Sequence, residues 1–338
     1  MKLKGVMISA GYFAGIQAEA WNRIPEAEIV AVADLISGKA KAFADKFHFP
    51  RAYESAEEML DQEKPYFVDV ATRPESHLAL VMAAAQRGIH VICQKPMAPT
   101  WDECVAMVEI CEAAKVRLVI HENWRWHPWY RETKRLLVAG RLGQPFHIAF
   151  QWRTGDGRGP EPYAQQPYFL QMPRLLVYEA LVHTLDTFRF LFGEVKSVFC
   201  QNRRINPVLI GEDQSLIQLS FANGGLGLID ANRFSGPVPA PLAMGTMIID
   251  GESATLRLSP DGRLWLSDAG QSETPHDFSI PTAGYRGDSV RATQAHLIDC
   301  LCTGKPSESE GRDYLKTVAL VEACYESDKA GQLVSPRL

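Results

Sequence analysis

The stretch "LKGVMISAGYFAG", residues 3–15, decides the fold with which the rest of the chain must agree. A β-rich apolar run ends at Ser9, and a helical segment follows it. A phosphate-binding turn between a strand and a helix has the pattern G-x-G-x-x-G/A. Gly11 and Ala14 fill its second and third positions, but Ser9 stands where the first glycine belongs. Alone, this altered motif is weak, and a strand–helix turn without any ligand stays open as the alternative.

The second β-rich run, "EIVAVAD" (28–34), gives the turn its context. It ends in Asp34, and an acidic residue at that point of such a fold hydrogen-bonds the adenosine ribose. A 2′-phosphate would be repelled there, and no arginine follows Asp34 to receive one. The sequence therefore predicts NAD rather than NADP as the cofactor. The predicted contacts in these two segments are Ser9, Gly11, Tyr12, Phe13, Ala14 and Asp34.

Short β-rich runs alternate with helical segments as far as residue 122. Three more runs cover residues 66–72, 89–94 and 117–122, and their nearly continuous apolar character is typical of strands buried on both faces. This alternation predicts an open, doubly wound parallel sheet, a Rossmann domain over residues 1–122. Ligands bind such sheets at the carboxyl ends of the strands. The predicted cofactor contacts at these ends are Thr72, Arg73, Pro74, His77, Gln94, Lys95 and Asn123.

A different pattern follows residue 122 and predicts a second, α+β domain over residues 123–338. Apolar runs separated by tight turns predict a large, mainly antiparallel open sheet. These runs cover residues 146–153, 215–221, 225–231, 246–250 and 254–259, and helices are expected at 127–143, 178–192, 288–303 and 312–330. Residues 154–173 are rich in Gly, Pro and Gln, which indicates a long ordered loop or lid near the site.

Composition excludes several classes of function. The formal net charge is −5 and no basic cluster occurs, which disfavours nucleic-acid binding. No apolar stretch approaches the length of a membrane span. The seven cysteines are odd in number and lack zinc spacing, so we expect buried free thiols in a reducing compartment, a cytoplasmic location and no metal site.

Two segments carry residues suited to acid–base chemistry. Pro96 ends a strand directly after Lys95, which leaves a long amine at the strand tip, where it could stabilise developing alkoxide charge. His183 follows Glu179 by four residues, so a helix would place both on one face. An imidazole suits a general base at neutral pH. A solvated lysine in a turn and an ordinary pair on a solvated helix are the alternatives.

These motifs together resemble the Gfo/Idh/MocA family of oxidoreductases. Its E-K-P, T-P-x-x-x-H and D-x-x-x-H patterns correspond to residues 94–96, 72–77 and 179–183, and "ENWRWHPWYRETKRLL" is similar to its linker helix. The resemblance implies a Rossmann domain, a second domain whose open sheet mediates oligomers, and hydride transfer between nicotinamide and a sugar or polyol. It implies catalytic roles for Lys95, His183 and Glu179. Three positions depart from the family pattern: Ser9 for glycine, Gln94 for glutamate and Glu179 for aspartate.

Substrate hydroxyls need donors and aromatic walls. The candidates for substrate binding are Lys95, Arg125, Trp152, Arg153, Tyr163, Glu179 and His183. Within the family the chain resembles D-apiose dehydrogenases, which implies oxidation of a branched pentose to its lactone. Inositol dehydrogenation, NAD-dependent glycoside hydrolysis and a non-catalytic NAD-bound regulator remain alternatives. The partners expected are a small sugar or polyol and further copies of the chain, as a dimer or tetramer.

Overall fold

The computed structural model describes residues 2–337, which form two compact units. The first contains the chain up to Trp126 together with Thr282–Val318. The second contains His127–Pro281 and the residues from Ala319 onward. A late segment thus returns to the unit built by the start of the chain, which a single boundary at residue 122 leaves out.

The first unit is built on a six-stranded parallel sheet with the order β3-β2-β1-β4-β5-β6. The strands are β1 (Leu3–Ile8), β2 (Ala27–Ala33), β3 (Arg51–Tyr53), β4 (Phe67–Val70), β5 (His90–Gln94) and β6 (Leu118–His121). The strand order reverses beside β1, so the carboxyl ends of β1 and β4 form the switch point at which such sheets bind ligands. The doubly wound fold is confirmed. Only β3 was not predicted, because three residues are too few to give an apolar pattern.

Helices between the strands cover this sheet. They are α1 (Tyr12–Trp21), α2 (Lys39–Phe47), α3 (Ala56–Glu63), α4 (His77–Ala85), α5 (Trp101–Ala113) and the late helix α8 (Ser289–Thr303). Thr100 and Glu103 form a reciprocal capping box at the start of α5. Helix α8 packs against α1, and its Leu297 and Ile298 share a buried core cluster with Ala14. The late segment is therefore part of the hydrophobic core of the first unit.

The second unit contains an eight-stranded sheet with the order β14-β13-β12-β11-β7-β10-β9-β8. The strands are β7 (Pro145–Arg153), β8 (Val195–Arg203), β9 (Gln214–Phe221), β10 (Leu226–Asn232), β11 (Gly245–Gly251), β12 (Ala254–Leu258), β13 (Leu264–Asp268) and β14 (Thr274–His276). Only β7 and β10 run parallel, so the predicted mainly antiparallel sheet is confirmed. Strands β8, β13 and β14 were not predicted.

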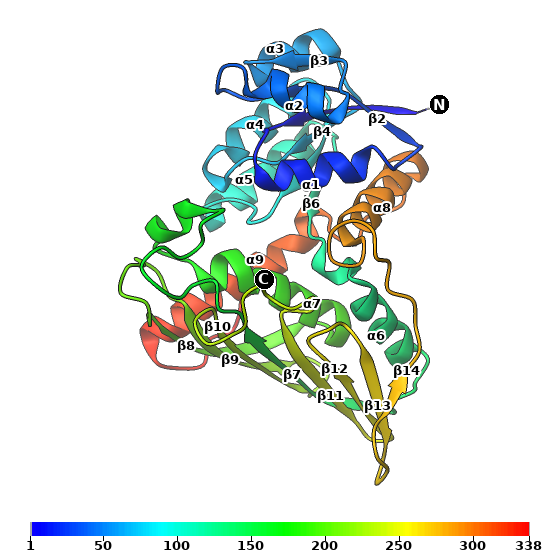
Figure 1. The fold of residues 1–338 in the computed structure, drawn as a ribbon, viewed down its shortest axis with the longest axis vertical. Helices are drawn as coiled ribbons and strands as arrows, with labels where there is room; N and C mark the ends of the chain where they lie inside the picture. Colours follow the sequence, from blue (N-terminus) through cyan, green and yellow to red (C-terminus); the bar gives the residue numbers. More distant parts are fainter. Residues whose placement is uncertain (1, 338) are drawn as a thin grey trace. The chain divides into compact units, whose positions relative to one another are not determined.

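The two faces of this sheet differ in character. Helices α6 (Pro128–Val138) and α7 (Val182–Phe192) lie along one face, as does the later part of α9 (Gly311–Ala330) (Figure 1). Strand residues that point to that face are buried, as Ile148 and Phe150 show. On the opposite face Leu216, Leu226 and Ile248 are 39%, 58% and 36% exposed. This open face is a continuous surface with apolar side chains on neighbouring strands.

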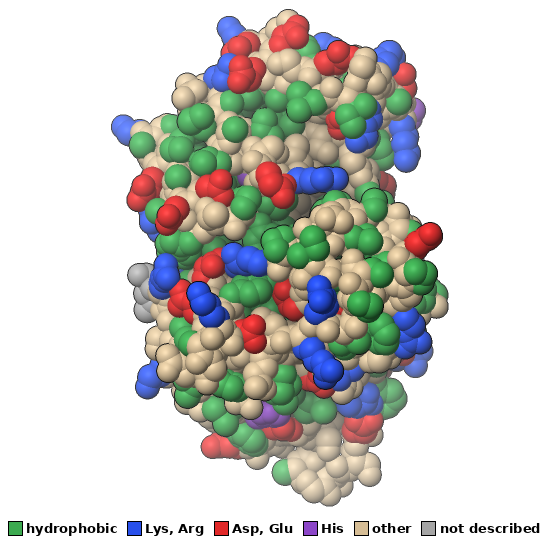
Figure 2. Space-filling model, turned by 90° about the vertical axis from the view of Figure 1, so that its left-hand side faces the viewer, with side chains coloured by type: hydrophobic (Ala, Val, Ile, Leu, Met, Phe, Trp, Pro, Cys, Tyr) green, Lys and Arg blue, Asp and Glu red, His purple; other side chains and the backbone are tan. Residues whose placement is uncertain are grey.

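The structure shows how the cysteines and the charged side chains are distributed. Six cysteines are buried and free, but Cys302 is exposed near the end of α8, so the prediction of buried thiols is wrong there. Figure 2 shows Lys and Arg interspersed with Asp and Glu over the face it presents. Between residues 2 and 337 no helix is long and apolar enough to cross a membrane.

Candidate active site

The turn after β1 has the local geometry of a phosphate-binding turn. Gly11 is the N-cap of α1, which has no side-chain cap. Ser9 has a φ of 105°, a conformation that glycine adopts far more readily than serine. Its Oγ accepts a hydrogen bond from Gly11 N at 3.1 Å, so the serine stabilises locally the turn that it strains. The missing glycine of the motif is therefore replaced by a residue in a glycine-like conformation.

Two substitutions at this position separate strain from hydrogen bonding. We expect Ser9→Ala to lower the free energy of unfolding by about 1 kcal/mol, because it loses the bond to Gly11 and keeps the positive φ. Ser9→Gly loses the same bond but relieves the backbone, so it should lie closer to wild type. Denaturant unfolding of the NAD-free protein measures both values. Equal losses in the two variants would show that Ser9 is not strained.

The carboxylate of Asp34 accepts two main-chain hydrogen bonds beside the same turn. Its Oδ2 accepts from Ala10 N at 2.8 Å and its Oδ1 accepts from Ile36 N at 3.0 Å. Leu35 is 88% exposed, and Ile36 is 62% exposed, beside this carboxylate. Uncapped helix amides, an acidic strand end and an exposed apolar flank together fit a dinucleotide. Lys39 Nζ lies 3.5 Å from Asp34 Oδ2, a neighbouring cation that sequence reasoning did not weigh.

His77 joins two of the loops that follow the strands. It is fully buried, and its Nδ1 and Nε2 lie 3.0 and 3.1 Å from the carbonyl oxygens of Met97 and Thr72. Burial lowers the pKa of His77, and a neutral imidazole can donate to only one of these carbonyls. The ring thus connects the loop after β4 with the loop after β5. Pro74 begins the short 3₁₀ helix η1 (Pro74–Ser76), which follows Arg73 in the first of these loops.

Lys95 follows β5 at the carboxyl edge of the parallel sheet, before the cis peptide bond to Pro96. Its main-chain N donates to Gln94 Oε1 at 2.8 Å. Glu122 is fully buried just beyond the neighbouring strand β6. Burial raises the pKa of Glu122, against the opposing effects of the Trp124 N–H bond and of the positive charges of Lys95 and Arg125. Lys95 therefore stands in the electrostatic field of a buried carboxyl group.

Two further predicted residues lie just beyond β6. The Asn123 amide donates to Ser289 Oγ at 3.1 Å, at the start of α8. Arg125 lies in the 3₁₀ helix η2 (Trp124–Trp126), is 5% exposed and donates to the Glu308 carbonyl at 2.5 Å. Both side chains thus bind the late segment of the first unit, which fixes the linker after β6.

In the second unit, Glu179 and His183 lie on consecutive helical segments. The predicted helix 178–192 is wrong at its start, because Leu176–Leu181 forms a π-helical turn and α7 begins at Val182. The wider turn still leaves both residues on one side, and such turns are frequent at functional sites. Glu179 is half-buried, whereas His183 is 6% exposed.

Glu212 holds the start of the π-helical turn. Its carboxylate accepts from Leu175 N at 3.2 Å and from Val177 N at 3.0 Å. The hydroxyl of Tyr325 donates to Glu212 Oε1 at 2.5 Å. Burial, followed by the nearby Glu212 charge, raises the pKa of Tyr325. A buried anion at a helix start is electrostatically favourable, so this contact fixes the segment that carries Glu179.

Arg233, just beyond β10, is the centre of a buried cluster that sequence reasoning missed. It is 7% exposed and forms an ion pair with Asp156. Its guanidinium lies 4.4 Å from the ring centroid of Tyr163, and its Nη1 is 3.9 Å from Glu179 Oε2. The predicted ordered loop 154–173 is thereby attached to the residue pair on the helices. Among the described residues, the buried Tyr163 hydroxyl has no hydrogen-bond partner.

Two predicted substrate contacts on β7 point in opposite directions. Trp152 is 2% exposed and its Nε1 donates to Thr154 Oγ1 at 3.4 Å. Arg153 is the next residue, so its side chain leaves from the other face of the strand, where it pairs with Asp230 at 2.5 Å. The structure therefore separates Arg153 from Trp152 and from the helix-covered face.

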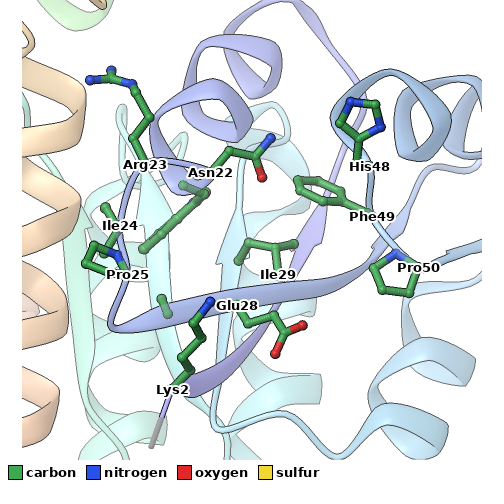
Figure 3. Close-up of a pocket in the computed structure, with 12 residues that line it drawn as sticks. Lys2, Asn22, Arg23, Ile24, Pro25, Glu28, Ile29, His48, Phe49 and Pro50 are labelled. Atoms are coloured by element: carbon green, nitrogen blue, oxygen red, sulfur yellow. The ribbon is translucent and has the colours of Figure 1, made fainter.

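A pocket of about 570 Å³ lies at the opposite end of the parallel sheet (Figure 3). Lys2 directly precedes β1 and Glu28 lies near the start of β2, while Asn22 and Arg23 follow α1. These residues are remote along the strands from Lys95 and Asp34, so this pocket does not belong to the candidate site. Within residues 2–337, no three His, Cys, Asp or Glu side chains are grouped to hold a metal ion.

Comparison with known proteins agrees with this geometry. A family model described as "Oxidoreductase family, NAD-binding Rossmann fold" matches residues 3–122. A second, "Oxidoreductase family, C-terminal alpha/beta domain", matches residues 134–335. A D-apiose dehydrogenase from Paraburkholderia graminis is 36% identical, over 98% of this chain and 89% of that protein. One from Rhizobium rhizogenes is 35% identical, over 98% of this chain and 97% of that protein.

Solved structures give the same result. The crystal structure of an oxidoreductase from Agrobacterium radiobacter in complex with NAD+, L-tartaric acid and magnesium has a TM-score of 0.92 at 34% identity, over 99% of this chain and 98% of that chain. A levoglucosan dehydrogenase in complex with NADH and levoglucosan shares the fold, with a TM-score of 0.90 at 19% identity over the full length of both chains. The predicted NAD cofactor and oxidoreductase class are confirmed. The chain belongs to the Gfo/Idh/MocA family of NAD-binding oxidoreductases.

Proposed function

We propose that this protein oxidises a sugar at a hydroxyl-bearing carbon, with D-apiose as the first candidate substrate and its lactone as the product. The proposal rests on the full-length similarity to two D-apiose dehydrogenases, at 36% and 35% identity. The reaction removes a hydride from carbon and a proton from the hydroxyl group. NAD supplies the hydride acceptor, so the residues of this chain must bind the sugar and take the proton.

In this proposal each catalytic residue has a separate role. His183 takes the proton of the reacting hydroxyl, and Glu179 orients the imidazole or binds a neighbouring hydroxyl. The ammonium of Lys95 donates a hydrogen bond to the reacting oxygen and stabilises its developing negative charge. Lys95 belongs to the first unit, whereas Glu179 and His183 belong to the second. Their convergence around one substrate stays a prediction.

The buried cluster in the second unit supplies sugar-binding groups. The Tyr163 hydroxyl is buried and has no hydrogen-bond partner among the described residues. Such a group gains free energy when a ligand hydroxyl pairs with it. Trp152 lies on the helix-covered side of the sheet at 2% exposure, and its contact with the sugar stays a prediction. We therefore keep Tyr163 and Trp152 as substrate contacts, together with Arg125, and regard Arg153 as a residue of the open face.

A substrate screen tests the proposal. Purified protein with NAD is mixed with D-apiose, unbranched aldopentoses, inositols and glycosides, and NADH absorbance is recorded. Selective NADH formation with D-apiose, followed by identification of the lactone, is the expected result. Faster reaction with inositols would favour inositol dehydrogenation. Release of free sugar from glycosides would favour NAD-dependent hydrolysis, and no turnover with any compound would favour the regulatory function.

We further propose that the open face of the second sheet joins copies of the chain into a dimer or tetramer. Apolar residues occupy neighbouring strands there: Leu228 on β10 and Ile248 on β11 both flank Ala149 on β7. Exposed apolar patches of this kind mark interaction sites more often than free surface. With six cysteines buried and free, we also propose a reducing, cytoplasmic location.

A charged substitution tests the oligomer. Leu226→Glu places a carboxylate on the open face, so we expect sedimentation velocity to show a shift from oligomer to monomer at micromolar concentration. Val138→Glu is the matched control, because Val138 is also apolar and 77% exposed but lies on α6. Equal sedimentation of Leu226→Glu and wild type would place the interface elsewhere.

A further inference from the structure

Buried polar side chains of the first unit form a hydrogen-bonded row that includes Gln17 on α1, the helix that follows the turn at residues 9–14, called here the fingerprint turn. Asp69 lies on β4 in an otherwise apolar strand and is fully buried. Its carboxylate accepts from Gln17 Nε2 at 3.0 and 3.1 Å and from Trp21 Nε1 at 2.6 Å. Gln94 Nε2 donates to Gln17 Oε1 at 3.5 Å, at the long end of hydrogen-bond distances. We call Asp69, Gln17 and Gln94 the Asp69 chain.

The Asp69 chain has one direction of hydrogen bonding. The indole of Trp21 can only donate, so Asp69 must accept. Gln17 gives its NH₂ group to Asp69, which leaves its oxygen facing Gln94. Gln94 therefore presents its NH₂ group to Gln17 and its own oxygen to the main-chain N–H of Lys95, at 2.8 Å. Each donor in the row meets an acceptor, from Lys95 N to the Asp69 carboxylate.

This direction accounts for the amide at position 94, where the family pattern has glutamate. A carboxylate at position 94 would place an acceptor oxygen against the oxygen of Gln17, and two acceptors cannot form a hydrogen bond. It would also place a second buried carboxyl group close to Asp69, whose pKa burial raises to about 7. The NH₂ group of Gln17 is directed to both oxygens of Asp69, so only its own oxygen faces position 94. The acceptor at position 69 and the amide at position 94 are therefore matched through Gln17.

We propose that Asp69 is a positioning residue for Lys95, acting through Gln17 and Gln94. The inference rests on the proposed function, because it assigns significance to the placement of Lys95. Gln94 holds the main-chain N of Lys95, which is bonded to the Cα that carries the lysine side chain, so the Asp69 chain restrains the point from which the ammonium extends. A small displacement of a catalytic group lowers turnover more than it lowers binding.

Reversal of the hydrogen-bond direction tests the proposal. Asp69→Asn and Gln94→Glu should each lower kcat roughly tenfold to a hundredfold, with a smaller change in the KM for sugar. In the double variant the side-chain amide of Gln17 can flip. The new amide at position 69 then donates to the oxygen of Gln17, and the NH₂ group of Gln17 donates to the new carboxylate at position 94. We expect the double variant to regain kcat to within about threefold of wild type, which single losses that simply multiply cannot produce.

Matched controls and a second measurement keep the test decisive. Asp45→Asn and Gln86→Glu make the same chemical changes at exposed positions of the first unit, and both should behave like wild type. If the enzyme is active and the kcat losses of the two single variants simply multiply in the double variant, Asp69 is not a positioning residue. If wild type forms no NADH with any sugar, the proposed function fails instead. Denaturant unfolding of the NAD-free variants then decides: rescue in the double variant supports the matched chain, and additivity overturns it.

Discussion

Replacement of Lys95 by alanine is expected to lower turnover by at least about a hundredfold, the lower end of the range for loss of one acid–base or electrostatic group. The physical reason is the loss of the positive charge that stabilises developing negative charge on the substrate oxygen. Binding of NADH, followed by fluorescence, should stay close to wild type, because the fingerprint turn and Asp34 are untouched. Turnover near that of wild type would remove Lys95 from the mechanism.

The control for this experiment is Lys196→Ala. Lys196 is exposed on β8 of the second unit, so its loss changes the net charge equally without touching the candidate site. Unfolding of both variants should be recorded as well. A Lys95 variant that unfolds like wild type and binds NADH, yet reacts slowly, has lost a chemical group rather than its structure.

Replacement of His183 by asparagine is expected to lower kcat by about 10² to 10⁴, because asparagine cannot accept the proton of the reacting hydroxyl. Wild-type turnover should fall on the acidic side, where protonation of the imidazole removes the base. In His183→Asn this fall of kcat towards low pH, the acidic limb of the pH profile, should be absent. Steady-state rates across a pH series, at saturating sugar and NAD, measure both effects.

A variant that keeps the acidic limb would show that another group is the base. His48→Asn is the matched control, since His48 lies at the end of α2 in a left-handed conformation that asparagine tolerates. It changes the same residue type in the first unit, and its rate and pH profile should match those of wild type.

The sequence predicts most of the first unit because its signals are local. Buried parallel strands give long apolar runs, and glycine and acidic residues mark the strand ends that bind the dinucleotide. Strand β3 has three residues and no such run, so periodicity cannot detect it. The packing of α8 beneath α1 is a long-range contact, and one sequence without an alignment carries no signal for it.

The residues missed in the site are those whose importance depends on distant partners. Asp69 offered a usable signal, a carboxylate inside an apolar strand run, which indicates a buried polar contact. Arg233 offered none, because an arginine after a strand is ordinary until Asp156 and Tyr163 are seen around it. Arg153 was proposed for the substrate from its neighbourhood, and strand alternation places it on the other face.

The membership of α8 in the first unit has a consequence for the order of events on the ribosome. The sheet from β1 to β6 is synthesised within the first 121 residues, yet Leu297 and Ile298 are needed to complete its hydrophobic core. The first unit therefore stays incompletely packed while the second unit is being translated. The side of α1 that packs against α8 is therefore uncovered in the nascent chain until the late helix emerges.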